Sequence, residues 1–158
     1  MNGYILHEGT TNGEKFVVIA TGFERPSVNR KTGDMIQVWI LLIDQSPVAG
    51  IQSGLDALTI CIGCPFASGE GCYVNPGQAP LMIWQAYHRG SYPTLRDYSV
   101  FQSRGVRFGA YGNPSLIPLK IVKAIRRRAG KTTGYFHDWR ANRDASKYNR
   151  YFMASTDT

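Results

Sequence analysis

Strand-like and helix-like segments alternate along the second half of this 158-residue chain. The strand segments are short and rich in β-branched or aromatic residues, and they are expected at 106–110, 132–136 and 151–154. The helical segments are expected at 79–88, 114–129 and 141–148. Gly130 should cap the second helix at its carboxyl end. Alternation of this kind predicts βα units and a mainly parallel sheet.

The first 50 residues have a different character. Residues 15–21 and 35–44 are predicted to be strands, the second one apolar on both faces and so central in the sheet. Residues 24–34 are predicted to be a loop, and 45–54 a turn region because of its Pro and Gly residues. We therefore expect an α/β fold in which a β-rich segment, 1–50, precedes a partial, barrel-like parallel sheet. An α+β fold is the alternative.

Length and composition favour one domain over residues 1–158, with the cysteine loop and the βα units in 55–158. No apolar run reaches the length of a membrane-spanning helix, so no membrane partner is expected. The first residues lack the basic-then-apolar layout of a signal peptide. We therefore expect a cytoplasmic location.

The three cysteines of the chain, Cys61, Cys64 and Cys72, lie within twelve residues. Their odd number in a chain without a signal peptide argues against a disulfide framework. A Cys-x2-Cys turn can place two sulfurs on one side of a metal ion, and Cys72 is near enough to add a third. Three buried thiols are the alternative, but a loop rich in Gly and Pro is not typical of a core. The sequence thus predicts a metal site.

The identity of the metal and its fourth ligand stay open at this level. Zinc would require a fourth ligand, whereas a [4Fe–4S] cluster can use three cysteines and leave one iron open. His137 is the first candidate for the fourth ligand because it follows an expected strand. His88 and Asp56 are weaker candidates. His137 could equally be held by local hydrogen bonds, or act as an acid or base.

Positive charge is concentrated near the carboxyl end. Residues 117–150 contain ten of the 18 basic side chains and two of the 11 acidic ones. A field of this kind attracts polyanions, chiefly nucleic acid, although a solvated helix face would look the same. The candidate nucleic-acid-binding residues are Lys120, Lys123, Arg126, Arg127, Arg128, Lys131, Arg140 and Arg143. Tyr135, Trp139 and Tyr148 could stack on bases.

Polar residues follow the expected strands, at the sheet edge where ligands bind in parallel sheets. Arg107 and Asn113 are candidates for positioning an anionic substrate at that edge. Ser27, Asn29 and Lys31 resemble a phosphate-binding loop in composition, but the Gly-x4-Gly-Lys spacing is missing. A plain turn is the preferred interpretation of that segment.

Several motifs together resemble an uncharacterised family of phage-encoded proteins. They are Ser27-x-Asn29-x-Lys31-Thr-Gly33, Cys61-x2-Cys64-Pro65…Gly71-Cys72-Tyr73, Arg107-Phe-Gly109-x-Tyr111-Gly112-Asn113-Pro114, Thr133-Gly134-Tyr135-x-His137-x-Trp139 and Met153-Ala154-Ser155-x-Asp157. The Cys-Tyr step also looks like that of phage proteins with radical-SAM-like barrels. The resemblance implies an iron–sulfur cluster, a partial barrel and a phage protein in a host cell. The cysteine spacing, x2 then x7, departs from the x3-then-x2 spacing of radical SAM enzymes.

Two functions from different classes fit these features, and the sequence favours the first. It is a binding module in which zinc or an iron–sulfur cluster holds the loop and the basic segment binds DNA or RNA. The second is a metal-dependent enzyme acting on nucleotides or nucleic acid. An inhibitor of a host protein is a third interpretation. A partial barrel would also leave sheet edges that a second copy could cover, which makes a homodimer a further expectation.

Overall fold

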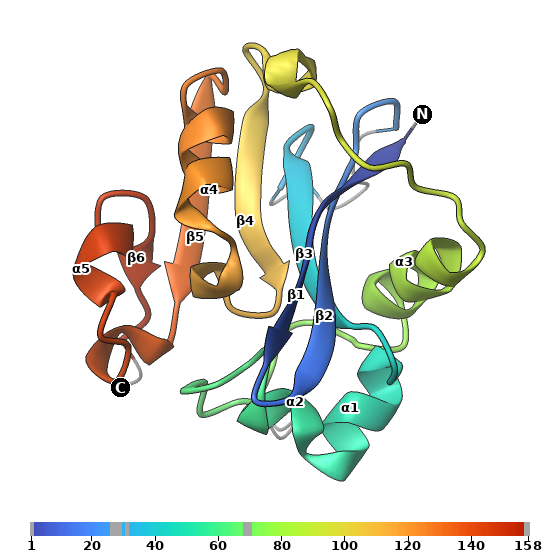
Figure 1. Cartoon of the computed structure of the whole chain (residues 1–158), viewed down its shortest axis with the longest axis vertical. Coiled ribbons are helices and arrows are strands. Elements are labelled where there is room, and N and C mark those ends of the chain that lie inside the picture. The colour runs from blue at the N-terminus through green and yellow to red at the C-terminus, as the bar shows by residue number, and fades with distance from the viewer. Residues whose placement is uncertain (1, 26–29, 31, 68–70, 157–158) are drawn as a thin grey trace.

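The computed structural model describes residues 2–25, 30, 32–67 and 71–156. In this part of the chain six strands form one mixed sheet, in sequence order (Figure 1). The strands are β1 (Gly3–Thr11), β2 (Glu14–Thr21), β3 (Ile36–Leu42), β4 (Gly105–Tyr111), β5 (Lys131–Phe136) and β6 (Met153–Ala154). The pairings β1–β2 and β2–β3 are antiparallel, whereas β3–β4, β4–β5 and β5–β6 are parallel.

The expected combination of sheet and helices is therefore confirmed, and the mainly parallel arrangement is confirmed only for the second half. The helices are α1 (Pro47–Ser53), α2 (Leu55–Leu58), α3 (Ala79–His88), α4 (Leu119–Arg126) and α5 (Ala145–Tyr148). Short 3-10 turns lie at Tyr98–Phe101, Pro114–Leu116 and Asp138–Arg140. None of the helices in the described ranges has both the length and the apolar character needed to cross a bilayer.

The expected turn region at 45–54 is wrong, because most of it forms α1. The side chain of Ser46 accepts a hydrogen bond from the Ala49 backbone N–H at 3.3 Å, which caps the helix. Pro47 occupies the first turn, where its missing N–H costs nothing. Gly54 ends the helix in the left-handed conformation, with φ 74°.

The single helix expected at 114–129 is also wrong. A 3-10 turn, Pro114–Leu116, is followed by extended backbone at Ile117, and α4 begins only after Pro118. The residue before a proline avoids the helical region, which separates the two segments. Gly130 is not the cap; α4 ends at Arg126 with Arg127 as its C-cap, and the Gly130 N–H donates to the Arg104 carbonyl at 2.9 Å.

The last elements are shorter than expected. The strand at 151–154 is reduced to Met153–Ala154, and the helix at 141–148 to Ala145–Tyr148. Helix α3 has the expected bounds. Its buried residues are Pro80 and Ile83, whereas Leu81, Trp84, Ala86 and Tyr87 are half-buried.

The two faces of the parallel half of the sheet differ in chemistry. Val106 and Phe108 of β4 belong to the same buried apolar cluster as Ile121, Val122 and Ile125 of α4, and Figure 1 shows α4 lying over β4 and β5. Side chains alternate between the faces of a strand. Arg107 of β4 and Tyr135 of β5 therefore project from the opposite face, away from α4.

Candidate functional site

The cysteine loop is attached to the carboxyl ends of β4 and β5. In Figure 1 this loop (green) lies at the end of the molecule to which β3, β4 and β5 point. Beyond β4, the Asn113 backbone N–H donates to the Ile60 carbonyl at 2.6 Å, and its side-chain amide donates to the Ile62 carbonyl at 3.4 Å. Beyond β5, the backbone of His137 lies so close to Gly63 that a Cβ atom there would come within 3.2 Å of the His137 carbonyl oxygen.

The residues singled out in the sequence as metal ligands meet in one place. Cys61, Cys64, Cys72 and His137 all line a cavity of about 290 Å³ beside these strand ends. Arg107 and Asn113, the expected anion-positioning residues, line the same cavity. The fold brings these distant positions together because the carboxyl ends of parallel strands share one sheet edge.

The cysteines border the cavity without forming a closed site. All three lie in the described part of the chain and are half-buried, and no disulfide joins them. Among the described residues, no three His, Cys, Asp or Glu side chains are placed closely enough to form a ready ligand set for a metal ion.

Cys61 is half-buried and packs against the apolar core. Burial raises the pKa of its thiol well above the ordinary value, the charges of Asp56, Cys64 and Cys72 add to that rise, and a backbone hydrogen bond from Gly112 acts against it. The cysteines are thus near enough to repel one another as thiolates. A bound cation would offset that repulsion and favour loss of the protons.

Asp56, one of the weaker candidates for the fourth ligand, forms a buried pair with Tyr111 next to Cys61, and this pairing was not expected from the sequence. The Tyr111 hydroxyl donates to the Asp56 carboxylate, and both residues are buried. The Asp56 carbonyl also accepts from the Cys61 backbone N–H at 2.7 Å. Burial raises the pKa of Asp56 to about 6, although the bond from Tyr111 acts in the opposite direction. Asp56 therefore holds the backbone at Cys61 by a hydrogen bond. It does not stand among the described residues that line the cavity with the cysteines.

Asp138 fixes the turn that carries His137. Its Oδ2 accepts from the Ser115 hydroxyl at 2.9 Å and from the Asn142 amide at 2.8 Å. Its other oxygen, Oδ1, is buried and has no hydrogen-bond partner in the described part of the chain. His88, the weaker candidate ligand, bonds instead to the Ile43 carbonyl at 2.9 Å, at the far end of α3.

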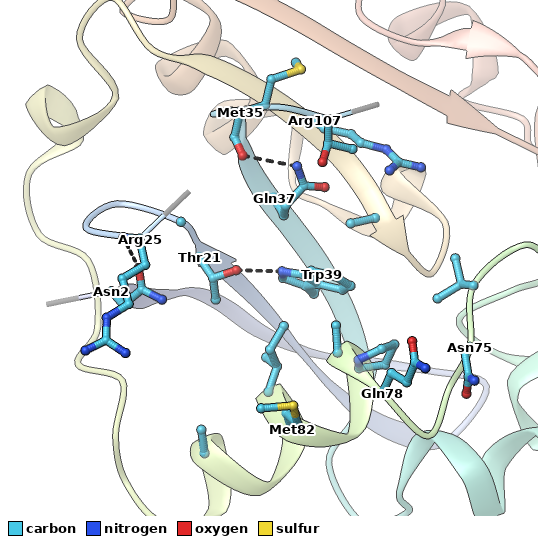
Figure 2. A pocket seen from close by; sticks show the side chains of 18 of the residues that line it. Asn2, Thr21, Arg25, Met35, Gln37, Trp39, Asn75, Gln78, Met82 and Arg107 are labelled. Atoms are coloured by element: carbon cyan, nitrogen blue, oxygen red, sulfur yellow. Dashed lines mark hydrogen bonds between the residues drawn. The ribbon is translucent and has the colours of Figure 1, made fainter. Parts of the chain in front are cut away.

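Arg107 stands between two cavities. Its guanidinium donates to the Tyr73 hydroxyl and lies 5.3 Å from the centre of the Tyr73 ring. Together with Tyr73, Val74 and Ala110 it also lines a second cavity, of about 580 Å³. Figure 2 shows this larger cavity, with Trp39 of β3 projecting between Thr21 and Gln78.

The eight candidate nucleic-acid-binding residues are all exposed or partly exposed, but they form two groups. Lys120, Lys123 and Arg126 lie on α4, and Arg127, Arg128 and Lys131 lie in or next to the connection from α4 to β5. Arg140 and Arg143 follow β5 at its other end, roughly 16 Å from Lys131 along a six-residue strand. Two further basic residues of the segment, Lys147 and Arg150, line one cavity with Lys123 of α4.

The aromatic residues expected to stack on bases also differ from one another. Tyr135 is 55% exposed and available to a ligand. Trp139 donates its indole N–H to the Ser155 carbonyl at 2.8 Å, and the Arg140 guanidinium lies 4.2 Å from the centre of its ring. Tyr148 is buried and donates to the Ile117 carbonyl at 2.9 Å, so a stacking role for Tyr148 is wrong.

Comparison with known proteins found no matching family model, no matching curated protein and no matching solved structure. The motif residues Ser27, Asn29, Lys31 and Asp157 lie outside the described residues.

Proposed function

We propose that the chain is a metal-dependent enzyme whose centre is an iron–sulfur cluster bound by Cys61, Cys64 and Cys72. One observation carries the proposal: the three cysteines and His137 line a single cavity at the carboxyl ends of β4 and β5. Sites of this kind, at strand ends, are where parallel sheets bind ligands and carry out chemistry.

The volume of the cavity favours a cluster over a single zinc ion. Thiolates bind zinc at about 2.3 Å, so a structural zinc site draws its ligands together and is closed. Here the cysteines border about 290 Å³ of space. A cluster of four irons and four sulfides needs such space, and three cysteines would leave one of its irons open to His137 or to a substrate.

The surroundings of the cavity suit this group. Gly112 reaches Cys61 with a backbone hydrogen bond, and hydrogen bonds to sulfur are one means by which proteins tune clusters. When bound, such a cluster supplies electron transfer or Lewis-acid chemistry. This chain would then contribute Arg107 and Asn113 to hold an anionic substrate and His137 as a further ligand or an acid–base group.

The finer fold expectation belongs to the same proposal. We propose that β3 to β6 form part of a barrel-like wall whose polar face encloses the substrate. Support comes from the strand order, which follows the sequence without reversal, and from the contrast between the apolar face under α4 and the polar face beside the cavities. The expected homodimer, host-protein partner and cytoplasmic location stay predictions.

The decisive test is metal analysis of protein purified without oxygen and reconstituted with iron and sulfide. We expect about four irons per chain and a broad visible absorption band, both lost in Cys61→Ser, Cys64→Ser and Cys72→Ser. His137→Ala should keep the iron and alter the electron paramagnetic resonance spectrum of the reduced cluster. His88→Ala, whose imidazole lies elsewhere, should leave both unchanged.

Two results would contradict the proposal. One colourless zinc per chain would return the loop to the role of a structural staple and favour the binding module. Absence of iron and zinc, with all three thiols open to alkylation, would remove the metal site altogether.

Nucleic-acid binding is kept as a second candidate function because the cations on and after α4 are close together in the sequence and reach solvent. This group, Lys120, Lys123, Arg126, Arg127, Arg128 and Lys131, is referred to below as the α4 basic group. It lies over the apolar face of the sheet, on the side away from the cysteine cavity.

A further inference from the structure

The larger cavity is crossed by a row of polar side chains in neighbouring strands. In the sheet register Thr21 of β2 is paired with Gln37 of β3, Gln37 with Arg107 of β4, and Arg107 with Thr133 of β5. Paired residues in adjacent strands point to the same face. The row therefore runs along the face opposite α4, and its first three members line the cavity of about 580 Å³.

The row is unusual because much of it is buried. Thr21 and Gln37 are 8% and 6% exposed. Burying a hydroxyl or an amide is unfavourable unless hydrogen bonds replace those to water. Thr21 accepts from the Trp39 indole N–H at 2.9 Å, and the Gln37 amide donates to the Met35 carbonyl at 3.1 Å. Figure 2 shows the Gln37 oxygen turned toward the side of the cavity where Arg107 lies. Buried, oriented polar groups in an otherwise apolar cavity are typical of ligand sites.

The charged side chains among the described residues that line the cavity are all positive. Arg25, Arg89 and Arg107 line it, and the described lining residues include no Asp or Glu. Figure 2 places Arg25 and Arg107 at opposite ends, with Trp39 between them. Arg25 is anchored there by its backbone N–H, which donates to the Asn2 side chain at 3.1 Å. Arginines that line an open cavity attract phosphate groups, which accept their paired N–H bonds.

The size and the remaining lining fit an aromatic heterocycle. A volume near 580 Å³ lies within the range of sites for small organic ligands. Trp39, Tyr73 and Tyr92 provide apolar and aromatic surface, while Thr21 and Gln37 provide hydrogen-bonding groups. The two cavities also share Arg107 as a common wall, so a ligand in the larger one would lie next to the cysteine cavity.

We propose that the larger cavity binds an organic phosphate of mononucleotide size, with Arg107 contacting its phosphate and Thr21 and Gln37 contacting its base. This inference deepens the proposed function, for which it names the substrate class. It is tested separately, because the cavity is formed by residues other than the cysteines.

The experiment measures binding of AMP and GMP by isothermal titration calorimetry, with adenosine and guanosine as neutral counterparts. It uses the intact chain and the Cys61→Ser/Cys64→Ser/Cys72→Ser variant. We expect both nucleotides to bind and both nucleosides to bind at least about tenfold more weakly. Binding that persists in the triple-serine variant shows that the cavity acts independently of the cluster. A reconstituted wild type that binds nucleotides but holds no iron would contradict the cluster and keep this inference.

Variants of the cavity supply the second readout. Arg107→Gln should weaken AMP binding by about 10- to 100-fold, the worth of a charge-assisted bond. Arg25→Gln, at the opposite end of the cavity, should weaken it less. Arg96→Gln, an exposed arginine outside the cavity, is the matched control. Gln37→Glu should abolish binding, because the new carboxylate would repel phosphate and pair with Arg107, while the melting temperature shows that the fold is kept.

Two results overturn the inference. One is equal affinity for AMP and adenosine. The other is nucleotide binding that changes as little in Arg107→Gln and Gln37→Glu as it does in Arg96→Gln.

Discussion

Gly63 lies against Asp138 at the point where the cysteine loop meets the end of β5. A Cβ atom on Gly63 would come within 3.1 Å of the Asp138 Cα, which is closer than side-chain carbons normally approach backbone. The glycine also has φ +77°, a conformation that other residues adopt only with strain. The Cys61–Cys64 turn can reach the strand end because this position has no side chain.

Replacement of Gly63 by Ala should therefore move the cysteine turn away from β5. We expect a loss of stability of about 1–2 kcal/mol from the backbone strain alone, together with a reduced iron content per reconstituted chain. Gly54→Ala is the control, because Gly54 has a similar φ of +74° but open space around its Cβ position. Urea unfolding and iron analysis are the measurements. Equal stability loss in both variants, with full iron in both, would contradict the role of the contact.

The hydrogen bond from Tyr111 to Asp56 should make a large contribution to stability. Tyr111→Phe would leave the buried Asp56 carboxyl without this partner, at an expected loss of about 1–3 kcal/mol in the free energy of unfolding. Tyr135→Phe removes a hydroxyl from an exposed ring and should cost almost nothing. If urea unfolding gave the same small change for both variants, Asp56 would have to be satisfied in another way.

The sequence predicted the meeting of the cysteines with His137 and Asn113 for a general reason. Residues that follow parallel strands share one sheet edge, so strand assignment brought positions 113 and 137 together. Position 61 was joined to them by the expected metal site. The polar row from Thr21 to Thr133 could not be predicted in this way. Its alignment depends on the register between strands, and between β3 and β4 that register shifts after Val38 pairs with Phe108. Periodicity within one segment does not contain this information.

Local signals were present for two of the elements that the sequence analysis missed. Ser46, Pro47 and Gly54 stand where a helix requires its N-cap, its first residue and its C-cap. The sequence analysis nevertheless assigned a turn, because the segment contains Pro and Gly. Strand β1 was not expected, although Asn12-Gly13 is a strong signal for a two-residue hairpin turn; both residues have the positive φ that this turn requires. The break at Pro118 could likewise be predicted from the proline itself. The Asp56–Tyr111 pair, 55 positions apart, had no such local signal.

Loss of the Tyr87 hydroxyl proton should lower the free energy of unfolding at alkaline pH. Its hydroxyl donates to the Glu8 carboxylate at 2.6 Å. Burial, followed by this hydrogen bond and the charges of Glu8 and Asp44, raises the pKa of Tyr87 from 10 to about 12. The folded chain therefore keeps a proton that the unfolded chain loses over this interval, so the contribution is complete below pH 10 and is lost as the pH rises toward 12.

The check on Tyr87 compares urea unfolding of the wild type, Tyr87→Phe and the exposed-ring control Tyr135→Phe across that interval. Tyr87→Phe should show a shallower fall in the free energy of unfolding than the wild type, because it has no proton to lose at this position. Tyr135→Phe should follow the wild type. Identical slopes for all three proteins would show that the Glu8 contact does not persist in solution.

The basic residues on and after α4 lead to a prediction about nucleic-acid binding. If the α4 basic group contacts phosphates, Lys120→Gln/Lys123→Gln/Arg127→Gln should make the dependence of log K on log salt concentration less steep. The slope for duplex DNA should decrease in magnitude by about 0.9 for each neutralised side chain, or about 2.7 in total. Arg126 is left unchanged because it donates to the Thr132 hydroxyl at 2.5 Å, and its replacement could disturb the start of β5.

A second triple variant with the same change in charge distinguishes a localised binding face from an effect of the overall net charge. Lys15, Arg30 and Arg96 are exposed and lie outside the α4 basic group, so their replacement by Gln should leave the slope nearly unchanged. Fluorescence anisotropy with a labelled duplex at several salt concentrations measures both slopes. Equal decreases in the two triple variants would mean that the excess positive charge acts as a general field. A decrease confined to the α4 variant would place the phosphate contacts on the side of the sheet opposite the cysteine cavity, and so separate nucleic-acid binding from the proposed metal centre.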